Sequence, residues 1–72
     1  MEIKDILTKT EYKVLGHIAD GKDSKQIAEA LNISPFTVKN HRYHIIKKLG
    51  LEPQNNTLMK WAIDNKALFL TD

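Results

Sequence analysis

The sequence predicts an all-α fold, a single domain of four helices, and three observations support this prediction. Apolar residues recur at the spacing of an amphipathic helix in four segments of the chain. No segment shows the alternation of apolar and polar residues that is typical of a β-strand. The segment from Ser24 to Lys48 contains two of the four helix patterns, joined by a short turn, which is the spacing of a helix-turn-helix.

The composition is that of one small domain, residues 1–72, whose stability depends on its own apolar core. A chain of 72 residues is close to the smallest size at which a single core suffices. It has no cysteine, so neither a disulfide nor a thiolate metal site can stabilise it. No apolar run is long enough to span a bilayer, and the N-terminal residues lack the pattern of a signal peptide. We therefore expect a cytoplasmic protein without a membrane partner.

Positive charge is concentrated in the helix-turn-helix segment. The whole chain has a formal net charge of +2, but residues 22–48 contain six lysines and arginines against two acidic residues. A concentration of cations on one unit is what binding to nucleic-acid phosphates requires. The charge distribution therefore favours double-stranded DNA as a partner.

The first helix is predicted from about residue 9 to residue 20. Thr8 at its start and Glu11 three residues later form a capping box, in which each side chain accepts a hydrogen bond from the other residue's backbone N–H. Gly21 is expected to end the helix as a C-terminal cap. Residues 1–6 carry little pattern, and we expect them to fray or to lie along the core.

The second helix begins after a short turn at residues 22–24. Either Asp23 or Ser24 can cap it, and Gln26, three residues after Asp23, favours Asp23. Asn32 falls at the following turn, where a left-handed backbone is required and asparagine tolerates it. The residues expected to face the core, with the last of them filling the turn, are Ile27, Ala28, Leu31 and Ile33.

The third helix is predicted from about Pro35 to Leu49. Ser34 supplies the N-cap, Pro35 occupies a position where its missing N–H costs nothing, and Gly50 ends the helix. At about 100° per residue, the helix has two distinct sides. The inner side, facing the second helix, consists of Val38, Arg42, Ile45 and Leu49, with His41 at its edge. The outer side consists of Phe36, Lys39, Asn40, Tyr43 and Lys47.

The outer side of the third helix has the composition of a DNA-recognition surface. It combines cations, an amide, a phenol and a phenyl ring, whereas a side that only faces solvent is expected to carry Glu, Lys and Gln. Lys39 can donate to guanine, Asn40 can pair with adenine, and Tyr43 can contact a phosphate or a base edge. For Phe36 we expect contact with a thymine methyl group or a deoxyribose. The alternative is that Phe36 packs across the turn against Lys22 or the first helix.

A polar loop at residues 51–56 leads to a fourth helix, predicted over about residues 57–66. The side of this helix expected to pack on the core consists of Leu58, Trp61, Ala62 and Asn65. A second stripe consists of Met59, Ile63, Lys66 and Leu70. An additional exposed stripe on a small domain indicates a partner surface. The chain then closes with an apolar cluster of Leu68, Phe69 and Leu70.

Several motifs of the chain occur together in one known family. They are L-T-x-x-E at 7–11, V-L at 14–15, I-A-x-x-L at 27–31, S-P-x-T-V-K-x-H at 34–41 and I-x-x-K-L-G at 45–50. With these motifs at this spacing, the chain resembles the LuxR/GerE-type helix-turn-helix (NarL/FixJ effector-like) over residues 7–68. The resemblance implies a four-helix domain whose third helix lies in the major groove of DNA.

The resemblance also implies a function, a sequence-specific DNA-binding transcription regulator associated with the bacterial nucleoid. Base contacts are expected at Lys39, Asn40 and Tyr43, to which we add Phe36. Phosphate contacts are expected at Lys25, Thr37 and Lys47, to which we add Lys22. In many relatives the fourth helix pairs two copies on DNA. Met59 and Ile63 are therefore the expected surface of a weak homodimer that forms on DNA.

Two alternatives stay open at this point. The chain resembles either a free-standing regulator or an effector domain cut from a longer protein, since it contains no receiver or ligand-binding domain. The competing function is a protein-interaction module that retains the fold and uses Phe36, Tyr43 and the apolar tail to bind a partner.

No enzyme is expected, because no nucleophile–base set or paired carboxylates are present. His41 and His44 lack a third ligand, so we expect no metal, cofactor or small-molecule ligand.

Overall fold

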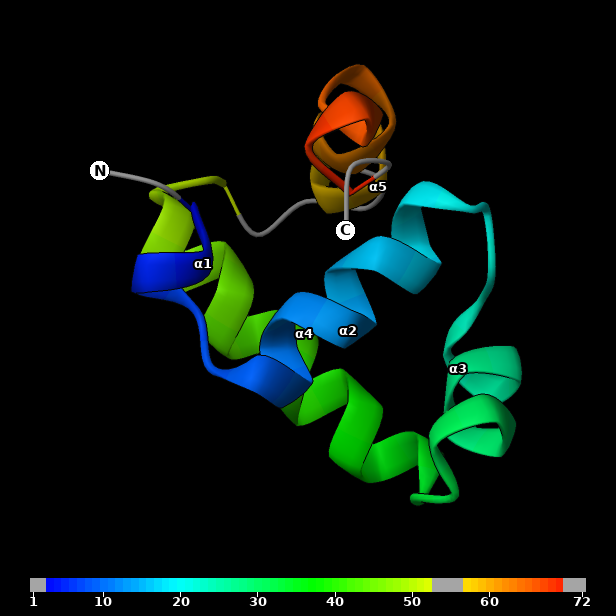
Figure 1. Ribbon diagram of the computed structural model, residues 1–72. Helices are drawn as coiled ribbons and strands as arrows, with labels where there is room; N and C mark the ends of the chain where they lie inside the picture. The colour runs from blue at the N-terminus through cyan, green and yellow to red at the C-terminus, as the bar shows by residue number, and fades with distance from the viewer. Residues whose placement is uncertain (1–2, 53–56, 70–72) are drawn as a thin grey trace.

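Five α-helices and one 3₁₀-helix form the described part of the computed structural model, residues 3–52 and 57–69 (Figure 1). They are α1 (Ile3–Ile6), α2 (Lys9–Ala19), α3 (Ser24–Leu31), α4 (Pro35–Leu49), α5 (Thr57–Asp64) and η1 (Lys66–Phe69). Helix α2 passes in front of α4 in this view, and α3 packs against α4 near its N-terminal end. Helix α5 packs on the other side of α2. The all-α prediction is confirmed, and α2 to α5 are the four predicted helices.

The core is centred on α2, which contacts α3, α4 and α5. The buried apolar side chains are Leu7, Val14, Leu15, Ile18, Ala19, Ile27, Ala28, Val38, Ile45, Leu58 and Ala62. Leu31, Ile33 and Trp61 pack against this core but are only partly buried. Each of the four predicted helices contributes its apolar stripe to this core. Burial of the apolar side chains of α4 in it holds that helix in place.

The predicted caps are confirmed at three helix starts. Thr8 with Glu11 and Asp23 with Gln26 form capping boxes in which both hydrogen bonds are present. The Ser34 hydroxyl accepts from the Thr37 N–H over 3.1 Å at the start of α4. These bonds satisfy backbone N–H groups that have no partner within the helix, and so fix the residue at which each helix begins.

The helix ends also follow the local sequence. Asn32, after α3, has φ 57° and ψ 47°, the left-handed conformation predicted for it. Gly50 ends α4 with φ 69°. Asp20 is the C-cap of α2, and Gly21 follows it with φ 83°, so the predicted glycine lies one residue after the cap. The N–H of Lys22 donates to His17 O over 3.1 Å and that of Gly21 to Ile18 O over 2.9 Å, which closes a Schellman motif.

The structure differs from the sequence prediction at both ends of the chain. A one-turn helix, α1, forms in residues that were expected to fray or to lie along the core, and its Ile6 packs against the core. The helix itself was not predicted, because four residues are too few to show a helical period. The fourth helix ends at Asp64 instead of Lys66. Asn65 follows the last residue of α5, and both its backbone N–H and its Nδ2 donate to Trp61 O, over 3.0 and 2.8 Å. The side chains of the predicted cluster at Leu68–Leu70, and loop residues 53–56, lie outside the described residues.

An ion pair that the sequence analysis did not predict joins α2 to the last turn of α4. The Lys48 Nζ lies 2.7 Å from Glu11 Oε1, and the Thr8 N–H donates to the same oxygen over 2.9 Å. Glu11 is only 3% exposed. Burial by itself raises the pKa of Glu11, but the hydrogen bonds from Lys48 and Thr8 outweigh burial and hold this pKa below its ordinary value.

Acid is expected to destabilise the domain through Glu11. Because the folded-state pKa of Glu11 is lowered, its contribution to stability is fully present above the ordinary value of 4.5 and is lost as the pH falls through the folded-state pKa. Urea unfolding of the wild type and Glu11→Gln between about pH 3 and pH 6 measures this contribution. The variant should be less stable at the upper pH and should lose less stability in acid.

The matched control for this prediction is Glu29→Gln, at an exposed position of α3. It makes the same substitution of glutamate by glutamine without breaking an ion pair of the described residues. The free energy of unfolding of this variant should therefore depend on pH as that of the wild type does. A parallel loss of stability in the wild type and Glu11→Gln would contradict the assigned role of Glu11.

In the described residues, no helix has the length and apolar character needed to cross a membrane.

Candidate nucleic-acid interface

Helix α4 is the element that presents the predicted recognition residues. The Ser34 cap and Pro35 fix its start, and the glycine at position 50 ends it, giving a helix of 15 residues. Val38 and Ile45 on its inner side are fully buried against the rest of the core. The opposite side is therefore turned outward along the whole length of the helix.

The predicted base-contacting residues share this outward side. Phe36 is 72% exposed and Tyr43 is 52% exposed. Lys39 and Asn40 are exposed as well, and their side chains make no hydrogen bond or ion pair within the described part of the chain. The exposure of Phe36 contradicts the alternative that this ring packs across the turn. The structure thus brings together the four residues predicted to contact bases, without burying any of them.

Tyr43 and Lys47 form a pair one turn apart on α4. The Lys47 Nζ lies 5.1 Å from the centroid of the Tyr43 ring, within the range of a cation–π contact. The Tyr43 and His44 rings lie 6.0 Å apart between centroids. Both Tyr43 and Lys47 are exposed, so this contact contributes little to stability but holds the ammonium group beside the phenol.

The residues predicted to contact phosphates differ in how free their side chains are. Lys25, on α3, is exposed. Thr37 is half-buried, and its hydroxyl lies 2.9 Å from Ser34 Oγ, so it already takes part in the cap. The Lys22 Nζ lies 3.1 Å from His17 Nδ1 and donates to it. Of the four predicted phosphate contacts, Lys25 and Lys47 are the two exposed ones in the described residues.

The surroundings of His17 favour its neutral form, which is the form that its contact with Lys22 requires. Burial lowers the pKa of His17, and the Lys22 ammonium lowers it further, while the Asp20 carboxylate acts in the opposite direction. A neutral ring can accept a hydrogen bond from Lys22 at Nδ1, whereas a protonated ring cannot. The sequence analysis did not predict this contact, because it depends on the turn between α2 and α3.

Arg42 is a further residue of this region to which the sequence analysis assigned no role. It was expected on the inner side of α4, and it is half-buried there. Its Nη1 donates to Ser24 Oγ over 3.2 Å, which joins α4 to the first residue of α3. The signal for Arg42 in the sequence is a cation within an otherwise apolar helical stripe.

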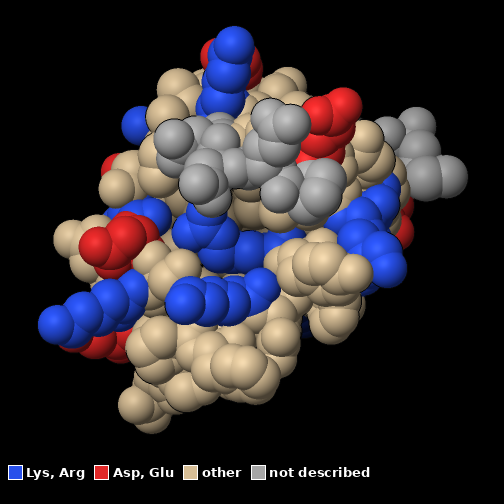
Figure 2. Space-filling view, turned by 180° about the vertical axis from the view of Figure 1, so that it is seen from behind, with Lys and Arg blue, Asp and Glu red and all other residues tan. Residues whose placement is uncertain are grey.

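Positive side chains lie across the surface on the α4 side of the molecule. Helix α4 lies behind α2 in Figure 1, and Figure 2 shows the molecule from that side. Lysine and arginine side chains cross the middle of this face, with acidic side chains mostly around them (Figure 2). The lysine and arginine side chains attract a polyanion to the centre of this face, and the acidic side chains repel it at the edges.

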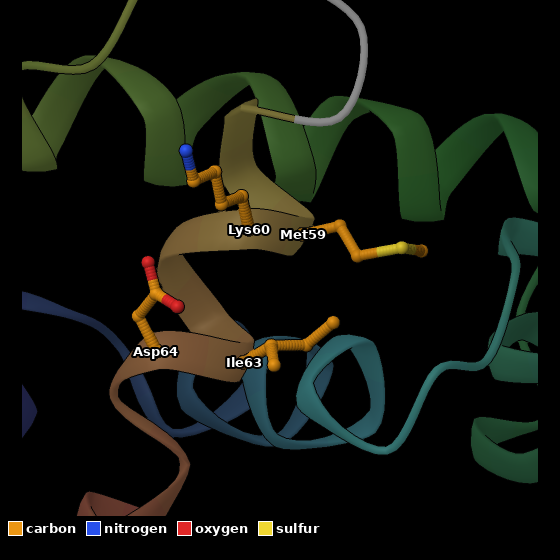
Figure 3. A pocket seen from close by; sticks show the side chains of 4 residues that line it. All are labelled: Met59, Lys60, Ile63 and Asp64. Atoms are coloured by element: carbon orange, nitrogen blue, oxygen red, sulfur yellow. The ribbon is translucent and has the colours of Figure 1, made fainter.

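The predicted dimer surface lies on α5, apart from the outer side of α4. Met59, Lys60, Ile63 and Asp64 line an open pocket there (Figure 3). The Met59 and Ile63 side chains extend to one side of α5, and those of Lys60 and Asp64 extend to the other (Figure 3). Ile63 is 50% exposed, whereas Met59 is half-buried and packs against the core. Of the two predicted dimer residues, Ile63 is therefore the more exposed one.

Comparison with known proteins identifies relatives of the chain. The model of the family described as bacterial regulatory proteins, luxR family, matches residues 5–62. The oxygen regulatory protein NreC of Staphylococcus aureus, in strains JH9 and JH1, is 43% identical over 63 residues. The match covers 88% of this chain and 29% of the relative, so the chain spans less than a third of the length of these curated relatives. No solved structure matches the chain.

Proposed function

Because this chain belongs to the luxR family of bacterial regulatory proteins, which are DNA-binding transcription regulators, we propose that α4 is its recognition helix and enters the major groove of double-stranded DNA. One observation carries this proposal, the outward side of α4. This side exposes a phenyl ring, two lysines, an amide and a phenol on a helix whose other side is buried. A helix of this kind fits the width of the major groove.

The residues of the outward side have separate roles in the proposal. Lys39 donates to the acceptor atoms of a guanine, and Asn40 pairs with an adenine, because these are the groups that each side chain matches in the major groove. Tyr43 contacts a base edge or a phosphate. Phe36 contacts a thymine methyl group or a deoxyribose, which would explain a large apolar ring exposed at the start of α4.

The cations around α4 contact the DNA backbone. Lys25 and Lys47 are exposed and bind phosphates directly. Thr37 and Lys22 contribute further phosphate contacts, because the Lys22 ammonium keeps two donors beyond its bond to His17 and the Thr37 hydroxyl can donate while it accepts from Ser34. We propose no catalytic activity for the domain, and we place it on DNA in the bacterial cytoplasm.

Fluorescence anisotropy with a mixed-sequence duplex at about 50 and 200 mM salt tests the proposal. The wild type should bind and should lose affinity steeply with salt. Lys47→Ala should weaken binding to all sequences alike and make the salt slope shallower by about one unit, because one phosphate contact is lost. Lys13→Gln removes an exposed cation of α2 and serves as the control, with an expected slope close to that of the wild type. Absence of binding at both salt concentrations would contradict the proposed function.

We also propose that α5 pairs two copies of the domain on DNA through Ile63 and Met59. The support is the exposure of Ile63 on the stripe that extends to one side of α5 (Figure 3). So small a patch is below the size of a stable interface, and the free domain should be monomeric or weakly dimeric. Two half-sites about one helical turn apart would raise the effective concentration of the second copy, so that the contact appears as cooperativity.

Ile63→Glu is expected to abolish cooperative binding to a paired site, because it places a charge in the contact between copies. Affinity for a single half-site and thermal stability should change little, since Ile63 is already 50% exposed. Titration of duplexes with one and with two half-sites measures both quantities. Thr10→Glu introduces the same side chain at an exposed position of α2 and should keep the cooperativity. Equal cooperativity in the wild type and Ile63→Glu would show that α5 is not the dimer surface.

A further inference from the structure

Arg42 is a cation within the apolar inner side of α4. It lies four residues after Val38 and three before Ile45, and both of these neighbours on the same side are fully buried. Arg42 itself is half-buried. An aliphatic side chain would cost less to bury at this position, because a guanidinium loses hydration when it is buried. The presence of arginine therefore calls for a role other than core packing.

The described residues supply only part of what a guanidinium can bind. Its Nη1 donates to Ser24 Oγ over 3.2 Å, and this is the one hydrogen bond of the Arg42 side chain in the part of the chain that the structure describes. The group has five N–H donors, so most of them are left for water or a ligand. The ion pairs of the described residues join Lys48 to Glu11 and Lys66 to Asp20, and neither includes Arg42.

The acidic residue next to Ser24 in the sequence already accepts a hydrogen bond. Asp23 precedes Ser24, and its Oδ1 accepts from the Gln26 N–H over 2.8 Å in the capping box of α3. The next residue after Ser24 is Lys25, which is exposed. The Arg42 guanidinium thus lies at the junction of α3 and α4, bonded to the residue that precedes Lys25, and it has no carboxylate partner among the described residues. An anion from outside the chain is the group that this arrangement lacks.

A DNA phosphate is the anion that fits. The planar guanidinium can donate two parallel hydrogen bonds to one phosphate, a geometry that lysine cannot reproduce. The contact with Ser24 holds the guanidinium in one orientation relative to both helices of the helix-turn-helix. A phosphate bound there would be fixed relative to α3 and α4 together, and the angle between α4 and the groove would be fixed with it.

We propose that Arg42 is a positioning residue, whose guanidinium is held by Ser24 and binds a DNA phosphate at the α3–α4 junction, so that it sets the angle at which α4 enters the groove. This inference rests on the proposed function, since it requires that the domain binds DNA through α4. The exposed lysines each contact DNA from one helix, whereas the contact of Arg42 depends on both α3 and α4. Two properties of Arg42 then affect DNA binding separately: its charge, and the orientation that Ser24 gives to its guanidinium.

Three variants separate these effects. Arg42→Gln removes the charge, Arg42→Lys keeps the charge but loses the planar fork, and Ser24→Ala leaves the arginine but removes its tether. Lys13→Gln is the control for the loss of one positive charge. Each is titrated at about 50 and 200 mM salt against two duplexes, one carrying the sequence that the wild type selects from a random pool and one with that sequence scrambled.

The expected results differ between the variants. Arg42→Gln should make the salt slope shallower by about one unit on both duplexes, as the loss of one phosphate contact requires. Arg42→Lys should restore the slope but not the ratio of the affinities for the selected and the scrambled duplex. Ser24→Ala should keep the slope and lower this ratio by about threefold to tenfold, because the hydrogen bond that orients the arginine is absent.

Three results would overturn the inference. A salt slope of Arg42→Gln equal to that of Lys13→Gln would exclude the phosphate contact. A ratio of affinities in Ser24→Ala equal to that of the wild type would exclude the positioning role. If Arg42→Gln does not fold, Arg42→Lys decides, and a wild-type ratio in that variant would reject the proposal. Failure of the wild type to bind either duplex would instead show that the proposed function itself is wrong.

Discussion

Replacement of Ile45 by alanine is expected to remove about 2 to 5 kcal/mol from the free energy of unfolding. Ile45 has no exposed surface and lies on the inner side of α4, where it packs into the core. Its truncation loses the free energy of burying the removed apolar atoms. It also leaves a cavity, because the packing of α4 against α2 and α3 keeps the helix from moving in to fill the space. A domain of this size has a total stability of roughly 4 to 11 kcal/mol, so the loss is a large fraction of the whole.

Urea unfolding followed by far-ultraviolet circular dichroism measures this effect. The matched control is Ile63→Ala, which removes the same atoms from a side chain that is 50% exposed on α5. The control should lose less than about 1 kcal/mol, because half of its side chain is in water in the folded state. Equal losses in the two variants would mean that the inner side of α4 is not packed as the structure describes.

Lys39→Ala and Asn40→Ala should each weaken binding to the selected DNA sequence by about 1 to 3 kcal/mol. Each variant removes the hydrogen bonds to one base, while the phosphate contacts of the other cations stay in place. Affinity for unrelated duplexes should therefore change little for Asn40→Ala. For Lys39→Ala it should fall only by the effect of one lost charge, which is small beside the loss on the selected sequence.

Competition titrations with selected and scrambled duplexes measure both affinities in one experiment. Lys47→Ala is the contrasting variant, because its loss should be the same for both duplexes. If Lys39→Ala, Asn40→Ala and Lys47→Ala all lowered the two affinities by the same factor, the division into base-contacting and phosphate-contacting residues would be wrong. Thermal unfolding of each variant checks that the exposed substitutions leave the fold intact.

The positions of the long helices could be predicted from the sequence because their signals are local. The capping boxes at Thr8 and Asp23 and the left-handed residue Asn32 each involve residues no more than a few positions apart. The two sides of α4 follow from helical periodicity alone, and the structure buries one side and exposes the other. For the same reason, the exposure of Lys39 and Asn40 followed from their positions along the helix.

The contacts that join one helix to another could not be predicted in this way. Lys48 and Glu11 are 37 residues apart, and Arg42 and Ser24 are 18 residues apart. Their pairing depends on how α4 packs against α2 and α3, which no local pattern specifies. The end of α5 at Asp64 was not predicted either, and the chain continues after it as the 3₁₀-helix η1, which contacts α2.

Selection of bound sequences from a random duplex pool tests most directly the central claim, that the outward side of α4 recognises base sequence. The wild type and the control Lys13→Gln should enrich the same short motif. Lys39→Ala should enrich a motif that has lost its preference at one position, where the lysine is proposed to contact guanine. An unchanged motif in Lys39→Ala, or no enrichment by the wild type, would contradict the claim.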